Sequence, residues 1–114
     1  QRVKTASFDI MTSILFARSE ALKRNTTVTI TPESGSNWHT GWAIAAGATT
    51  LNEQSELSGV TISGPGSLSY SNNGRVTAAA GPIEIEISSA VSGVTPRCIR
   101  IDLSGRPNSK TGAC

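Results

Sequence analysis

The sequence predicts an α+β fold in which one N-terminal amphipathic helix packs on an antiparallel β-sheet of about six or seven strands. Two observations favour this class. Residues 3–24 contain neither Gly nor Pro and place apolar side chains at three- and four-residue intervals, whereas the rest of the chain is cut into short segments by Gly, Pro and Asn. The chain of 114 residues, 37% of them hydrophobic, is long enough for one compact core. We expect one globular domain over 1–114, with the helix in 1–25, a β-domain in 26–104 and a C-terminal tail in 105–114.

The helix is predicted by a broad apolar arc at the helical period. Thr5, Asp9 and Lys23 fall on the opposite side and are expected to be exposed. Lys23 and Arg24 suit a helix C-terminus, and Asn25 tolerates left-handed backbone, so we expect the helix to end there. The side chains expected to pack against the sheet are Val3, Ala6, Ile10, Met11, Ile14, Leu15, Ala21 and Leu22, with Phe8 and Ala17 on the same arc.

The strands are predicted by alternation of apolar and polar residues and by β-branched content. Segment 83–87 reads Ile-Glu-Ile-Glu-Ile, which places isoleucines inward and glutamates outward. The sequence Asn72-Asn73-Gly74 predicts a hairpin turn, because Asn and Gly accept the positive φ of tight turns. We expect a loop over 46–58 with a short irregular edge strand near 50–52, and a polar tail in the last ten residues. Strands are expected at 26–31, 41–45, 60–63, 68–70, 75–78, 83–87 and 97–103.

The sequence offers little that resembles catalytic chemistry. His39 is the single histidine and lies in a Gly/Ser-rich turn, which leaves Ser/His and Cys/His catalysis without a base. Glu84 and Glu86 point to one side of a strand, where they are expected to face solvent. The Gly-Pro-Gly sequence at 64–66 has proline where a phosphate loop needs a backbone donor. We therefore expect no catalytic residue, no cofactor and no metal site, and the chain is predicted not to be an enzyme.

Charge and aromatic residues leave two binding interpretations open. The net charge of +2 is too small to indicate a nucleic-acid or membrane protein, but the first 24 residues and residues 97–114 are basic while 25–96 are acidic. Arg106 and Lys110 lie in a polar segment that could contact phosphate, although a solvated tail is the simpler interpretation. Trp38 and Trp42 could stack on a sugar or base, although such a pair more often caps the core of a small sheet.

The two cysteines, Cys98 and Cys114, lack the C-x-x-C spacing of a zinc or redox motif. A disulfide between them would pin the end of the chain and contribute about 3 kcal/mol in the chain-entropy model. The pairing would also place the domain in an oxidising compartment. The alternative is a cytosolic protein with two free thiols.

Several motifs closely resemble the GspH/FimT family of type IV minor pilins and type II secretion pseudopilins. The most specific is the helix end Leu-Phe-Ala-Arg-Ser-Glu-Ala-Leu-Lys-Arg-Asn at 15–25, which leads into Thr-Val-Thr-Ile. Trp38, Gly41-Trp42, Ser-Gly-Val-Thr at 58–61 and Ser-Gly-Arg at 104–106 complete the likeness over most of the chain.

The resemblance implies a pilin-like fold and a role in filament assembly rather than catalysis. In this family a long N-terminal helix spans the inner membrane with its first half and packs on the β-domain with its second half. Residues 2–24 would be that second half, and because the chain starts at Gln1 we expect it to be a truncation that lacks the membrane segment and the prepilin peptidase site. The implied partners are other minor pilins and the major pilin, or pseudopilins.

Three functional hypotheses follow from the resemblance. The first is a structural minor pilin that primes type IV pilus assembly at or near the filament tip, moving from the inner membrane and periplasm to the cell surface. The second is the minor pseudopilin of a type II secretion system. The third is a DNA-receptor minor pilin, whose Gly-Arg-x-Arg-x-Lys stretch is matched here by Arg106 and Lys110 but has Asn108 in place of the second Arg; Arg100 is a further candidate contact.

Overall fold

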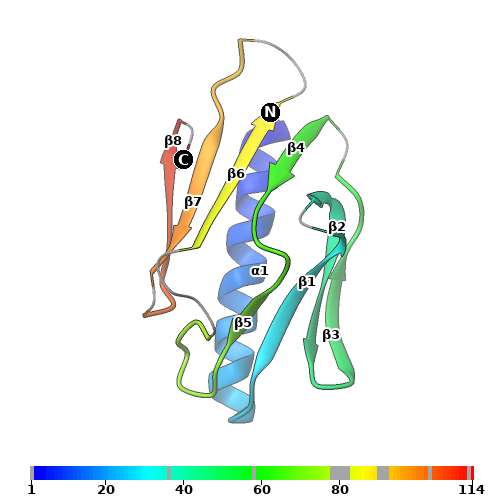
Figure 1. Ribbon diagram of the computed structural model, residues 1–114, viewed down its shortest axis with the longest axis vertical. Coiled ribbons are helices and arrows are strands. Elements are labelled where there is room, and N and C mark those ends of the chain that lie inside the picture. The colour runs from blue at the N-terminus through cyan, green and yellow to red at the C-terminus, as the bar shows by residue number, and fades with distance from the viewer. Residues whose placement is uncertain are drawn as a thin grey trace.

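The computed structural model describes residues 2–35, 37–57, 59–77, 83–89, 93–102, 104–112 and 114, with the side chain of Arg2 left out. One helix, α1, spans Arg2–Arg24 and lies lengthwise against one face of the sheet (Figure 1). The α+β fold expected from the sequence is thereby confirmed, with eight strands among the described residues. The strands are β1 (Val28–Ser34), β2 (Asn37–Ala46), β3 (Thr49–Gln54), β4 (Val60–Ser63), β5 (Leu68–Tyr70), β6 (Ile83–Ser89), β7 (Arg97–Ile101) and β8 (Pro107–Thr111).

The helix ends where the sequence predicts. Asn25 adopts a φ of 54°, and the amide of Thr26 donates to the carbonyl of Ala21 at 3.2 Å, which satisfies one of the last helical acceptors. Arg24 Nε also donates to Glu20 Oε1 at 2.8 Å across one turn. That hydrogen bond is the main reason that the pKa of the Glu20 carboxyl lies below its usual value.

All strand pairs in the sheet are antiparallel, in the order β5-β1-β2-β4-β6-β7-β8, with β3 paired to β2. The long strand β2 pairs along one side with β1, with Ile30 opposite Ile44. Its other side is shared, because residues 42–46 pair with β3 whereas Asn37 alone pairs with β4. His39 lies at this branch, where its Nδ1 accepts the Ile62 amide at 3.1 Å. His39 therefore replaces a missing ladder bond between β2 and β4.

The core lies between α1 and the helix-facing side of the sheet. Trp38 and Trp42 are both 1% exposed, with ring centroids 6.0 Å apart. Trp42 Nε1 donates to Ser13 Oγ at 3.0 Å, and Trp38 Nε1 donates to the Pro65 carbonyl at 2.8 Å. The tryptophans therefore belong to the core and present no ring face for stacking a ligand. The helix contributes Val3, Ala6, Ile10, Ile14, Ala17 and Ala21 to this core.

The expected packing face of the helix was too broad. Leu15 is 49% exposed and Leu22 is 48% exposed, and Phe8 on the same arc is 70% exposed. Leu15 and Leu22 directly follow the buried Ile14 and Ala21, so each is rotated by about 100° away from the sheet. Met11 is only partly buried. The prediction that Leu15 and Leu22 pack against the sheet is therefore wrong.

Four strand predictions also need correction. The short edge strand expected near 50–52 is longer, because β3 spans Thr49–Gln54, and the polar tail contains β8. The strand expected at 75–78 is reduced to an isolated bridge between Tyr70 and Val76 beyond the predicted 72–74 turn, and residue 78 lies outside the described residues. The strand expected at 97–103 ends at Ile101, with residue 103 outside the described residues. Local sequence patterns indicate only the middle of β3 and no part of β8, because the two sequences, Thr-Thr-Leu-Asn-Glu-Gln and Pro-Asn-Ser-Lys-Thr, are mostly polar.

Candidate interaction surface

The exposed apolar side chains of α1 form a row on the side of the helix next to β8. Phe8, Leu15 and Leu22 are spaced by seven residues, which is close to two helical turns, so they follow one line along the helix. Met11 lies between the first two and is partly buried. Large apolar side chains that are this exposed and aligned are typical of a contact surface.

A groove of about 590 Å³ runs between this row and the last two strands. Its helical wall combines the apolar side chains of Phe8, Met11 and Leu15 with four polar ones, and its floor carries one side chain from β7 and one from β8. A second hollow of about 390 Å³ shares Lys4 and Arg97 with it and extends to Val3 and Thr111. The first hollow, here named the α1–β8 groove, is lined by Lys4, Thr5, Ser7, Phe8, Met11, Thr12, Leu15, Arg97 and Ser109.

The outer face of β6, β7 and β8, away from the helix, carries both signs of charge. Glu84 lies opposite Arg100, which lies opposite Asn108 on β8, and the next row is Glu86, Cys98 and Lys110. Arg106 is exposed in the turn before β8. The fold therefore brings the predicted contacts Arg100, Arg106 and Lys110 to one end of the sheet, but it also places a glutamate beside Arg100.

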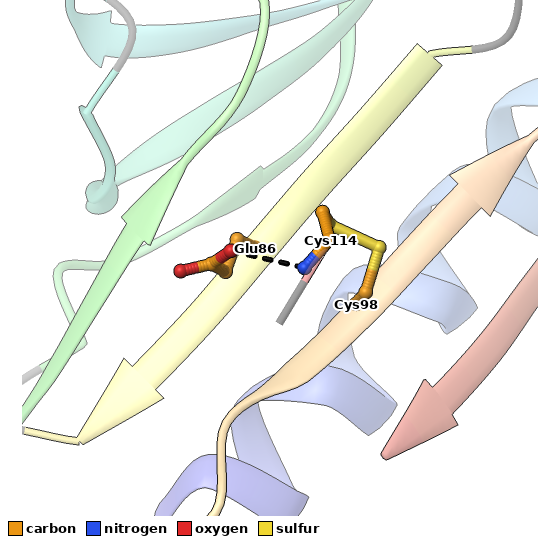
Figure 2. The surroundings of a disulfide bond; sticks show 3 residues. All are labelled: Glu86, Cys98 and Cys114. Atoms are coloured by element: carbon orange, nitrogen blue, oxygen red, sulfur yellow. Dashed lines mark hydrogen bonds between the residues drawn. A yellow bond between two sulfur atoms is a disulfide. The ribbon is translucent and has the colours of Figure 1, made fainter. Parts of the chain in front are cut away.

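A disulfide joins Cys98 to Cys114, with Cα atoms 5.1 Å apart, so the predicted pairing is confirmed (Figure 2). The Cys98 side chain is fully buried, and the Cys114 amide donates to Glu86 Oε1 at 3.1 Å. The end of the chain is thereby tied over β6 and β7 on the outer face. This tie braces β8, because the amide of Gly112 also donates to the Pro96 carbonyl at 2.7 Å.

A cluster around Tyr70 attaches the C-terminal half of the helix to two turns. Arg18 Nε donates to the Gly74 carbonyl at 3.0 Å, and the Tyr70 hydroxyl donates to the Gly105 carbonyl at 2.8 Å. Burial raises the pKa of Tyr70 to about 12, with the charge of Arg18 opposing the shift. The phenol is therefore a neutral donor that holds the turn before β8.

At the sheet edge away from β8, a hollow of about 300 Å³ near β3 is acidic. Glu33, Glu53 and Glu56 line it. Within the described ranges, no group of three or more His, Cys, Asp or Glu side chains is placed to hold a metal ion. The charge separation predicted along the chain thus becomes a separation across the sheet, with an acidic β3 edge and cations near β8.

Sequence reasoning missed the α1–β8 groove. The sequence predicts a strand at Arg97 and a polar tail at Ser109 and indicates no site at either residue. The seven-residue spacing of Phe8, Leu15 and Leu22 was the available signal, because three such residues on the border of an amphipathic face extend the apolar stripe beyond what one sheet covers.

A helix laid along an antiparallel sheet, with an apolar row left open on the helix, is the arrangement expected of a pilin-like fold. The sequence profile of the family described as "Type II transport protein GspH" matches residues 6–105. The chain therefore belongs to the GspH family of minor pilins and pseudopilins. No curated protein matches the sequence.

Solved structures of this class have the same fold. The type IV minor pilin FimU of Pseudomonas aeruginosa PAO1 matches in two crystal forms, both at 19% identity. One has a TM-score of 0.84 and covers 95% of this chain and 87% of FimU; the other has a TM-score of 0.82 and covers 94% and 91%. The minor pseudopilin EpsH from the Vibrio cholerae type 2 secretion system matches with a TM-score of 0.74 at 12% identity, over 97% of this chain and 98% of EpsH.

The described part of the chain contains no helix with the length and apolar character that crossing a membrane requires.

Proposed function

We propose that this chain is a structural minor pilin that helps to prime assembly of a type IV pilus and is incorporated at or near its tip. Its partners are other minor pilins and the major pilin. An inner-membrane segment preceding residue 1 anchors the subunit, with this domain in the periplasm before assembly and at the cell surface afterwards. The domain acts by contact and catalyses nothing.

The observation that carries this proposal is the open apolar row on α1. Phe8, Leu15 and Leu22 remain 70%, 49% and 48% exposed, although six other apolar side chains of the helix are buried in the core. Burying three such side chains against a neighbour contributes several kcal/mol, since full burial of one large apolar side chain is worth about 1.5–3 kcal/mol. A filament subunit needs such a surface along its helix.

The likeness to FimU favours a pilus over a secretion pseudopilus. The TM-score is 0.84 for this minor pilin and 0.74 for the pseudopilin EpsH, at low identity in both cases. The disulfide that ties the end of the chain suits an oxidising location, either the periplasm or the cell surface, and is compatible with both roles. A minor pseudopilin of a type II secretion system is the alternative function.

The test is where the full-length protein is found and which machine fails without it. We expect an epitope-tagged protein in the pilus fraction sheared from cells, and we expect deletion of its gene to reduce surface pili while secretion is unchanged. Loss of secreted enzymes with normal pili would contradict the pilus role and support the pseudopilin role. The control is restoration of pili by the gene carried on a plasmid.

The DNA-receptor function has one observation in its favour, which is that Arg100, Arg106 and Lys110 lie near one another at the β7–β8 end of the sheet. Glu84 faces Arg100 across the strands, and Glu86 lies in the same row as Lys110. Phosphate binding falls with each cation that is offset by a carboxylate. This function therefore ranks below the two filament roles.

A further inference from the structure

We propose that the open edge of β8 is a docking site for an extended segment of a neighbouring subunit, which adds one strand to the sheet and fills the α1–β8 groove. The inference rests on the proposed function, because the donor of the strand is another filament subunit. It deepens that function by naming the kind of contact: backbone pairing at a sheet edge.

The first argument is the hydrogen-bond register of β8. The backbone amide of Asp102 donates to the Arg106 carbonyl at 3.2 Å, and the backbone amide of Gly112 donates to the Pro96 carbonyl at 2.7 Å. In an antiparallel ladder the bonded pairs alternate, so the even-numbered residues of β8 bond to β7. The amides and carbonyls of Ser109 and Thr111 are then directed away from β7. The backbone nitrogen of Pro107 is also directed away from β7, so its missing N–H removes no hydrogen bond between β7 and β8.

The second argument is that a groove remains between the helix and the strands at this edge of the sheet. Strand β8 forms the edge of the sheet, with no further strand beyond it among the described residues (Figure 1). Phe8, Met11 and Leu15 form the apolar wall of the groove, whose floor includes Ser109 of β8. One more strand beside β8 would direct its alternate side chains to the helix side of the sheet, toward the open side of this groove.

The third argument is charge. An added strand would direct its remaining side chains to the outer face, next to Lys110 and Arg106. Acidic residues suit these positions, and basic ones do not. A second copy of β8 is therefore a poor donor, because it would place its own Lys110 on the same face.

This chain contains an example of the matching pattern. Strand β6 alternates Ile and Glu, buries Ile85 and Ile87, and places Glu84 opposite Arg100 on the outer face of β7. The partner segment that fits β8 thus alternates apolar and acidic residues over about five to seven positions, the usual length of a strand.

The test uses a capped, fluorescein-labelled peptide with the sequence of residues 83–89, Ile-Glu-Ile-Glu-Ile-Ser-Ser, and the domain described above. We expect saturable binding by fluorescence anisotropy, with slowed hydrogen exchange at the amides of Ser109 and Thr111. Ser109→Pro removes an outward amide and leaves the bonds to β7 intact, so binding should weaken about tenfold. Ser109→Ala is the matched control and should bind like the parent.

A second control is a peptide of the same composition in the order Ile-Ile-Glu-Glu-Ile-Ser-Ser, which breaks the alternation and should not bind. Thermal unfolding of Ser109→Pro should match the parent within a few degrees, which separates lost docking from lost folding. Failure of the alternating peptide to bind, or equal binding by Ser109→Pro, overturns the strand proposal. The pilus role is tested separately, by full-length protein in sheared pili and by the effect of gene deletion on pili and secretion, so the two failures are distinguishable.

Discussion

Replacing Gly105 with Ala is expected to destabilise the domain by about 4 kcal/mol. Gly105 has a φ of +93°, and a Cβ atom there would lie 2.0 Å from the Gly74 carbonyl oxygen and 3.0 Å from Tyr70 Cε1. The oxygen belongs to backbone that also accepts from Arg18, so it cannot move without breaking the tie between α1 and this turn. Backbone strain costs about 1–3 kcal/mol and overpacking costs a similar amount.

The matched control is Gly93→Ala. Gly93 has nearly the same backbone angle, with φ of +89°, but an added Cβ meets no atom within 4 Å. This variant should lose only the strain contribution, about 1–2 kcal/mol. Urea unfolding of the two variants checks the difference. Equal losses would mean that the Gly105, Gly74 and Tyr70 packing adds nothing to stability.

Removing the disulfide by Cys114→Ser is expected to cost about 3 kcal/mol, because the crosslink restricts the unfolded chain. The loop that it closes has a sequence separation of 16. The variant should also expose β8 to faster hydrogen exchange, since the tie over β6 and β7 is what returns the chain end to the sheet. Cys114 is the better position to change because Cys98 is fully buried and would leave a buried hydroxyl.

Reductant provides the control for this prediction. The parent protein unfolded in reductant should match Cys114→Ser, and reductant should leave the variant unchanged. A parent that is equally stable with and without reductant would show that β8 is held by its ladder alone.

The helix could be predicted in full from the sequence because its signals are local. Period, the absence of Gly and Pro, and the Lys23-Arg24-Asn25 ending all act within a few turns. Which apolar residues are buried is a different question, because it depends on how much of the helix circumference the sheet covers. Leu15 and Leu22 lie on the border of the arc, and only the width of the sheet determines that they are exposed.

The strands divide in the same way. Strand β6 can be predicted from its strict alternation of apolar and polar residues, whereas β8 has no large apolar residue that would indicate a buried face. Strand β8 forms because β7 lies next to it and because the disulfide holds the chain end in place. Strand β3 likewise depends on its neighbour β2. Edge strands with polar sequences are therefore set by tertiary contacts that a local pattern does not contain.

Only the helical part of the interaction surface could be predicted from the sequence. Its helical part could be recognised by the spacing of Phe8, Leu15 and Leu22. Its β part could not, because the roles of Arg97 and Ser109 follow from the β7–β8 register. The disulfide pairing could be predicted because only two cysteines are present.

The central claim is that the domain joins a filament through the exposed row of α1. The direct measurement is the amount of full-length Phe8→Ser/Leu15→Ser protein in sheared pili, relative to the parent and to Asp9→Ser on the other flank of the helix. We predict that the double variant folds with a thermal midpoint within a few degrees of the parent, is absent from pili, and fails to restore pili in the deletion strain, while Asp9→Ser behaves as the parent. Incorporation of the folded double variant at the parent's level would contradict the claim.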